Sequence, residues 1–227
     1  MLTFHIITIF PESVVPYLGA SILGRAISRG FLAVALYNPR DYTQDVHRSV
    51  DDKAYGGGPG MVMRALPILK AAARARGRKR RVKTIIFSSR GKTFTNAYAD
   101  KLRARYTDVI LIAGRYEGID ARVKRILRAE EVSIGPYTLS GGELPALAVV
   151  DAVARRMPGV LGSAESVEER RVASRDVYTR PEALRYRGKT YRVPRVLLSG
   201  NHRTIEVWRR ARDTAAAPPA LKKKKGN

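Results

Sequence analysis

Three short apolar runs constrain the fold of this chain most strongly, because each is followed by a polar loop that contains glycine. They span residues 83–89, 108–114 and 131–134. Segments with the residue spacing of helices lie between them, and strands that alternate with helices favour a parallel or largely parallel sheet covered on both faces. Ligands of open α/β sheets bind at the carboxyl ends of the strands. We therefore expect the three loops to converge on one binding site.

The last of these loops, residues 133–145, holds three glycines and two prolines. It should have a defined shape, because glycine tolerates positive φ and proline fixes φ. A mostly apolar helix is expected over residues 146–156, with Pro158 and Gly159 ending it. Unpaired backbone N–H groups at the start of such a helix could hold a polar small molecule. Taken alone, a tight turn before a core helix explains the same residues equally well.

The remaining pattern predicts one main domain and a smaller region after it. Further strands are expected over residues 2–10 and 31–37, and helices over residues 12–29, 63–76, 95–106, 119–127 and 201–215. Beyond Gly162 the sequence becomes polar and loses a clear period, which is typical of a linker. We predict a main α/β domain over residues 1–160, a linker over 161–177, a small C-terminal domain over 178–215 and a basic tail over 216–227.

The net charge indicates an anionic partner. The chain has 43 Lys and Arg residues against 20 Asp and Glu residues, a formal charge of +23, which favours nucleic acid or an anionic membrane surface. Residues 74–83 hold seven cations in ten positions, although a solvated linker in an arginine-rich protein would explain that cluster too. We favour nucleic acid, because no basic segment has the bulky apolar face of a membrane-surface helix.

Several classes of site are disfavoured. The sequence has no cysteine and its three histidines lack the spacing of a zinc site. The glycine-rich residues 56–60 lack the Lys and Ser/Thr ending of a phosphate-binding P-loop. For His202, hydrogen-bonded capping of the last helix is favoured over catalysis. No apolar run is long enough to span a bilayer and no secretory pattern opens the sequence, so a cytoplasmic protein without membrane contacts is expected.

Six motifs occur together in one order and spacing. They are residues 55–61, 114–120, 133–145, 158–162, 178–182 and 198–202. In this combination they closely resemble the bacterial tRNA (guanine-N1-)-methyltransferases that modify guanosine 37, next to the anticodon. The resemblance extends over residues 2–215.

The resemblance implies a SPOUT-class fold, in which the end of the sheet threads into a deep trefoil knot, with a small, mainly helical C-terminal domain over residues 178–215 that binds the tRNA. It implies S-adenosylmethionine as cofactor, magnesium dependence without an assigned metal ligand, tRNA as partner, and an obligate homodimer whose active sites are each built from both subunits. By the same resemblance, the cofactor residues are Phe87, Ser88, Ser89, Gly91, Gly114, Tyr116, Ser133, Ile134, Gly135, Pro136, Tyr137, Thr138, Leu139, Gly141, Gly142 and Pro145. The implied tRNA contacts are Asp51, Tyr55, Gly56, Gly57, Gly58, Ser166, Asn201, His202 and Arg203.

Methylation of guanine N1 needs a base for the N1 proton and a group that stabilises the charge growing on O6. The resemblance assigns the O6 contact to Arg155, whose guanidinium is always charged. By the same resemblance, Glu117 would help to hold either the edge of the guanine or the metal. A cation at the C-terminal end of a helix, a position that Arg156 shares, would explain Arg155 without a catalytic role.

The linker departs from the family, in which an aspartate within it is the general base. Here the linker is shorter, and ungapped alignment puts Arg170 at that place, whereas a one-residue deletion puts Glu169 there. We favour Glu169 as the base, with Glu168 and Asp176 as rivals. Two other hypotheses remain open: an RNA-binding protein of the same fold with lost or weakened catalysis, and a methyltransferase that acts on another RNA base.

Overall fold

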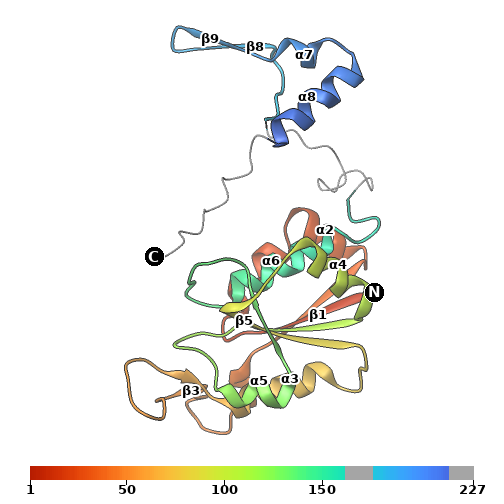
Figure 1. The fold of residues 1–227 in the computed structure, drawn as a ribbon. Coiled ribbons are helices and arrows are strands. Elements are labelled where there is room, and N and C mark those ends of the chain that lie inside the picture. Colours follow the sequence, from red (N-terminus) through yellow and green to blue (C-terminus); the bar gives the residue numbers. More distant parts are fainter. Residues whose placement is uncertain (162–175, 215–227) are drawn as a thin grey trace, which may run out of the picture. The chain divides into compact units, whose positions relative to one another are not determined.

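The computed structural model describes residues 1–161 and 176–214, with side chains described as far as Arg209. The chain divides into two compact units, Met1–Gly162 and Ser163–Asn227, and each is described by itself (Figure 1). Within the described ranges, no helix is both long enough and apolar enough to cross a membrane.

The first unit is built on a five-stranded sheet. Its order is β2-β1-β6-β5-β7, and every neighbouring pair is parallel. The strands are β1 (Leu2–Ile7), β2 (Leu32–Tyr37), β5 (Val82–Thr93), β6 (Asp108–Ile112) and β7 (Glu130–Ser133). A short antiparallel pair is formed by β3 (Asp51–Asp52) and β4 (Val62–Met63). The predicted parallel α/β sheet is therefore confirmed.

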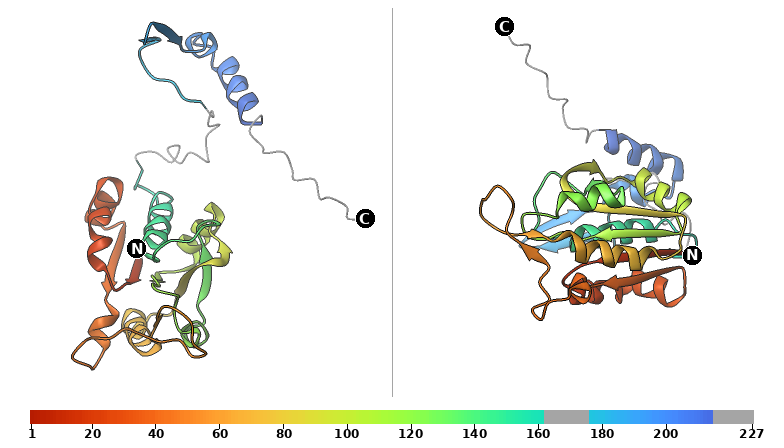
Figure 2. Two further views of the ribbon diagram at one scale, coloured as in Figure 1. Left: turned by 90° about the vertical axis from the view of Figure 1, so that its left-hand side faces the viewer. Right: turned by 90° about the horizontal axis from the view of Figure 1, so that it is seen from below.

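Helices cover both faces of this sheet (Figure 1 and Figure 2). One layer has α2 (Ser21–Ser28), α4 (Asn96–Arg105) and α6 (Glu143–Ala154), and the other has α3 (Ala65–Arg76) and α5 (Ala121–Leu127). Successive side chains of a strand point to opposite faces. In β6, Val109 and Leu111 accordingly join the core that includes α6, whereas Ile110 and Ile112 join the core that includes α3. Burial on both faces explains why the central strands are continuous apolar runs.

The single helix predicted over residues 12–29 is wrong, because the chain forms three short segments there. They are the 3-10 helix η1 (Pro11–Ser13), α1 (Val15–Leu18) and α2. Between α1 and α2 the backbone of Ala20 is extended. Gly24 packs so closely on this turn that an added Cβ would lie 2.2 Å from the carbonyl oxygen of Gly19. The apolar spacing continues through the break, so it did not reveal the turn.

Two boundaries next to the predicted binding loops also differ from expectation. Helix α6 begins at Glu143, three residues before the predicted start. Pro145 therefore lies in the first turn of the helix, where proline is tolerated because its missing N–H would have no helical partner. Strand β5 continues beyond Ser89 after an irregularity between Phe87 and Lys92, and then pairs again with β7. The loop before α6 is thus reduced to residues 134–142.

The described part of the second unit contains an antiparallel hairpin and two helices. Strand β8 (Ala183–Tyr186) pairs with β9 (Lys189–Arg192), and α7 (Arg195–Leu198) and α8 (His202–Thr214) follow. The helix predicted over residues 201–215 is present. The prediction that His202 caps it is wrong, because the side-chain oxygen of Asn201 accepts a hydrogen bond from the N–H of Thr204 at 3.3 Å. Asparagine is among the preferred N-cap residues.

Candidate active site

A cleft of about 500 Å³ opens where β5 is interrupted and where β6 and β7 end. Its walls are formed by residues 86–90, 114–121 and 131–142, together with Lys124 and Pro145, leaving out only Pro136 from the last stretch. The loops that follow the three apolar runs therefore converge, as expected from the sequence. The volume lies in the range typical of sites for small molecules.

Glycines allow the backbones of these loops to pass close to one another. The N–H of Gly142 donates to the carbonyl oxygen of Gly114 at 2.9 Å. An added Cβ on Gly142 would lie 2.5 Å from the Cα of Ala113, and one on Gly91 would lie 2.5 Å from the backbone nitrogen of Val132. None of these glycines has a positive φ. The expected need for positive φ is therefore wrong here, and the requirement for glycine is steric.

Most residues assigned to the cofactor by resemblance line this one cleft. They are Phe87, Ser88, Ser89, Gly114, Tyr116, Ser133, Ile134, Gly135, Tyr137, Thr138, Leu139, Gly141, Gly142 and Pro145. Gly91 and Pro136 do not line it, and Gly91 instead lies against the backbone of β7. Glu117, assigned to the guanine edge or the metal, lines the same cleft.

An ion pair beside the cleft, with a buried carboxylate, was not predicted from the sequence. Nη2 of Arg115 lies 3.0 Å from Oε2 of Glu143, whose side chain is only 5% exposed. The other carboxylate oxygen accepts a hydrogen bond from the hydroxyl of Thr8 at 2.7 Å. Arg115 also donates to the carbonyl oxygen of Ser140 at 3.3 Å, and its guanidinium lies over the ring of Phe10. These contacts fix the 134–142 loop to the start of α6 and to the segment after β1.

Further charged side chains of both signs line the cleft. Lys124 pairs with Glu131 at 2.6 Å, and Arg122 pairs with Asp120 at 2.6 Å. Hydrogen bonds from Arg122 hold the pKa of the Asp120 carboxyl below its usual value. These cations and carboxylates therefore pair with one another around the opening of the cleft.

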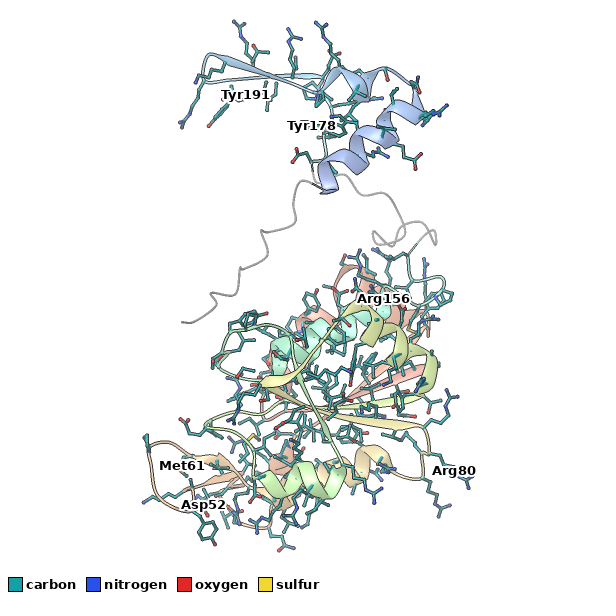
Figure 3. The ribbon with its side chains drawn as sticks, viewed as in Figure 1. Asp52, Met61, Arg80, Arg156, Tyr178 and Tyr191 are labelled. Carbon is teal, nitrogen blue, oxygen red and sulfur yellow. The ribbon has the colours of Figure 1, made fainter. Side chains whose placement is uncertain are left out.

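The glycine-rich segment 56–60 is joined to the loop after β6. The N–H of Glu117 donates to the carbonyl oxygen of Met61 at 3.0 Å, and the N–H of Arg115 donates to Sδ of Met63 at 3.2 Å. An added Cβ on Gly60 would lie 2.6 Å from Cγ of Glu117. Figure 3 shows Asp52 and Met61, which flank the segment, on the same side of the first unit.

The predicted tRNA contacts fall in two places. Asp51 lies in β3, and Tyr55, with a fully exposed side chain, directly precedes the glycine-rich segment. Residues 56–58 all have positive φ, which favours glycine there. Asn201, His202 and Arg203 lie at the start of α8 in the second unit.

Arg155 is not brought to the cleft of its own chain. It follows the last residue of α6, whereas the cleft residue Gly142 precedes the first. The 12 residues of this helix span about 18 Å at a rise of 1.5 Å per residue. Arg155 lies at the C-terminal end of α6, and Arg156, the other candidate for the helix-end role, donates to the carbonyl oxygen of Ala152 at 2.9 Å.

The remaining assigned residues are not connected to the cleft by the described structure. Glu169, Glu168, Arg170 and Ser166 lie outside the described residues, and Asp176 begins the described part of the second unit. The basic cluster of residues 74–83 joins the end of α3 to the start of β5, and so lies at the opposite end of the sheet from the cleft. Figure 3 shows Arg80 of this cluster far from Met61. Across residues 1–161 and 176–209, no three His, Cys, Asp or Glu side chains are grouped so that they could hold a metal ion.

Curated proteins of one kind are similar to this chain over most of its length. The tRNA (guanine-N(1)-)-methyltransferase of Pseudomonas aeruginosa is 49% identical over 212 residues, covering 90% of this chain and 81% of that protein. That of Thermomicrobium roseum is 46% identical over 225 residues, covering 96% and 82% respectively. That of Pseudoalteromonas atlantica is 46% identical over 211 residues, covering 91% and 78%. The family model described as tRNA (Guanine-1)-methyltransferase TrmD matches residues 2–222. The chain therefore belongs to the tRNA (guanine-1)-methyltransferase family.

Proposed function

We propose that this chain transfers a methyl group from S-adenosylmethionine to N1 of guanosine 37 in tRNA. The observation that carries the proposal is the convergence of three motif-bearing loops on one cleft, in a chain whose relatives are named tRNA (guanine-N(1)-)-methyltransferases. The formal charge of +23 supports a polyanionic substrate. A tRNA substrate in turn implies a cytoplasmic enzyme.

The residues around the cleft fit S-adenosylmethionine, which would supply an electrophilic methyl group on its sulfonium. The loop 134–142 would hold it mainly through backbone groups, with Ser88 and Gly114 on the opposite walls. Side chains at Gly135, Gly141 and Gly142 would collide with neighbouring atoms at 2.2 to 2.5 Å. The glycines therefore keep the loop compact around the space that the ligand would fill.

We place the proposed trefoil knot in the segment from β5 to α6. One close backbone approach supports it. Gly142, just before α6, packs on Ala113 and donates to the carbonyl oxygen of Gly114. The chain before α6 thus returns to the loop after β6, as the proposed threading would require.

The chemistry then divides between three side chains. Glu169 would accept the N1 proton, and Arg155 would stabilise the negative charge growing on O6, a contribution of about 10²–10³ in rate for one such donor. Glu117 lines the cleft and would orient the guanine edge.

The position of Arg155 supports a homodimer with shared active sites. Leu144 and Ala148 form an exposed stripe on α6, and Arg155 continues it at the far end. Antiparallel packing of this stripe on the same stripe of a second copy would satisfy two-fold symmetry. It would bring the partner's Arg155 near Leu144, which adjoins the cleft residue Pro145. A sedimentation experiment at micromolar concentration should show a dimer, and a species of the chain mass of 25.2 kDa alone would contradict it.

The magnesium dependence implied by the resemblance has no matching ligand group among the described residues. We therefore derive no catalytic step through a metal. Comparing methyl transfer in the presence of EDTA and of added Mg²⁺ would measure the dependence directly.

Incubation with methyl-labelled S-adenosylmethionine and unmodified tRNA tests the proposal. The expected result is one labelled nucleoside, 1-methylguanosine, at position 37. Label on a different base would favour the methyltransferase with another target. No transfer to any tRNA, with cofactor and tRNA binding intact, would favour the RNA-binding protein with lost catalysis.

A further inference from the structure

The second unit has no core of its own in its described part. Between residues 176 and 209 every side chain is at least partly exposed. All eight strand residues of the β8–β9 hairpin are exposed. A two-stranded hairpin is at best marginally stable in water unless another surface covers it. Some other molecule or segment should therefore cover one face of this hairpin.

The pairing register separates the hairpin into two different faces. Leu184 lies opposite Tyr191, and Tyr186 lies opposite Lys189. Because paired residues share a face and alternate residues do too, these four side chains form one face. Leu184, Tyr186 and Tyr191 are 55%, 58% and 55% exposed. This face therefore presents two aromatic rings and a leucine to the solvent (Figure 3, where Tyr191 is labelled).

Cations surround the two tyrosines. Arg185, Arg187, Lys189 and Arg192 lie within the ten residues from the start of β8 to the end of β9, and this stretch contains no acidic residue. The guanidinium of Arg187 lies 5.4 Å from the ring centre of Tyr186. The turn between the strands places Arg187 and Gly188 at positive φ. The tip of the hairpin is thus a sharp turn that is cationic on both sides.

This combination favours RNA over a second copy of the hairpin as the occupant. A second hairpin would bring four cations against four, in a chain that already carries a formal charge of +23. Unpaired nucleotides offer both flat bases, which stack on aromatic rings, and phosphates, which pair with arginine. A duplex has its bases stacked inside and offers the phosphates alone.

We propose that the β8–β9 hairpin is a stacking platform for unpaired nucleotides of the RNA substrate. Tyr186 and Tyr191 stack on bases, while Arg185 and Arg192, on the opposite face, contact phosphates. The proposal rests on the proposed function, because it takes tRNA as the RNA. Within the C-terminal domain that the resemblance assigns to tRNA binding, it names a base-stacking surface made of residues other than 201–203.

The test compares the affinities of hairpin variants for an unmodified tRNA transcript and for a fully paired RNA duplex. Tyr186→Ala and Tyr191→Ala should each weaken tRNA binding by about 10-fold, since one stacked base contributes roughly that much. Tyr186→Phe and Tyr191→Phe should retain affinity, because the ring remains. Thr190→Ala, on the other face, is the matched control. Duplex binding and S-adenosylmethionine binding should not change in any of these variants.

The salt dependence separates stacking from charge. The tyrosine variants should lower affinity at every salt concentration without changing the log–log slope, whereas Arg185→Gln should reduce the slope by about 0.7. If the alanine variants bind tRNA as the parent does, the platform is overturned. A loss of dimer or of thermal stability in them would then identify a protein surface as the occupant.

Failure of the platform is distinguishable from failure of the proposed function. If the parent methylates tRNA and the tyrosine variants bind it normally, only the platform falls. If the parent transfers no methyl group but the tyrosine variants lose RNA affinity as described, the platform stands and the proposed catalysis falls. A parent that binds no RNA at all overturns both.

Discussion

The two units of this chain differ in how they use apolar side chains. The first has a closely packed core on each face of its sheet, and residues such as Leu111 and Ile112 are fully buried. The described part of the second has a hairpin and two helices with no fully buried side chain. The shape of the first unit is therefore set by its own packing, whereas the second depends on an outside surface. A preformed cleft suits a small cofactor, and an adaptable basic surface suits a large RNA.

The largest expected effect concerns the preformed cleft. Gly141→Ala should abolish S-adenosylmethionine binding, because the added Cβ would lie 2.2 Å from Nε of Arg115 and 2.5 Å from Oε2 of Glu143. Gly19→Ala is the matched control, since its Cβ would meet the nearest atom at 3.6 Å. Calorimetric titration measures both. Unchanged cofactor affinity in Gly141→Ala would show that the cleft is not the cofactor site.

The next largest effect is expected for Glu169, the proposed general base. Glu169→Gln keeps the size of the side chain but removes the proton acceptor, so single-turnover methyl transfer should fall by about 10²–10⁴-fold. Cofactor and tRNA affinities should stay unchanged, because the loss is confined to the transition state. Glu168→Gln and Asp176→Asn should have much smaller effects. A normal rate in Glu169→Gln would assign the base to one of these rivals.

The difference in packing between the two units can be measured as the loss of unfolding free energy when one leucine in each unit is replaced by alanine. Leu111→Ala should lower the free energy of unfolding of the first unit by about 2–5 kcal/mol, the usual cost of a cavity in a closed core. Leu197→Ala, at a half-buried position of α7, should cost less than about 1 kcal/mol. Denaturant titration of both variants gives the two values. Equal costs would mean that the second unit has a closed core of its own.

The smallest expected effect is a dependence of stability on pH at the edge strand β7. Burial acts to raise the pKa of Glu130, but hydrogen bonds from Lys83 and Tyr98 lower it below the ordinary value. The pKa of Glu130 is therefore lower in the folded state than in the unfolded state. Its ionised carboxylate stabilises the fold at pH values above the unfolded-state pKa, and this stabilisation is lost as the pH falls through the folded-state pKa. Glu130→Gln should therefore cost about 0.5–1.5 kcal/mol at pH 7. The difference from the parent should disappear in acid, and a constant difference at all pH values would contradict this account.

Local sequence patterns predicted which segments form the sheet but not how the strands are ordered. The apolar run over residues 108–114 predicted a buried strand, and all five residues of β6 (Asp108–Ile112) are buried because helices cover both faces of the sheet. The order β2-β1-β6-β5-β7 depends on pairing between distant segments, which no local pattern encodes. The break between α1 and α2 was missed for a related reason. The contact of Gly24 with Gly19 is a packing event that leaves the apolar spacing unchanged.

For the candidate site, the sequence predicted which loops meet but not which of their charged side chains pair. The ends of the apolar runs indicated which loops meet, because parallel strands share one carboxyl edge. The ion pair of Arg115 with Glu143 was not predicted, since it joins residues from two loops and the sequence does not show which charges are buried. The one sequence feature that pointed to a buried Glu143 was its position directly after Gly142, at the start of an otherwise apolar helix. The distance of Arg155 from the cleft became visible only once α6 was seen as one continuous helix.

The most direct test of the account is methyl transfer by a heterodimer of two inactive variants. The central claim is that one chain supplies the cofactor cleft and the other supplies Arg155. Gly141→Ala and Arg155→Ala, each inactive or nearly so alone, are co-expressed with different tags. Random pairing should then restore about a quarter of the parent activity, because half of the dimers contain one intact site out of two. Co-expression of Gly141→Ala with Glu117→Gln, which both alter the cleft, should restore nothing. If the Gly141→Ala and Arg155→Ala mixture also remains inactive, the active site is not shared between the chains as proposed.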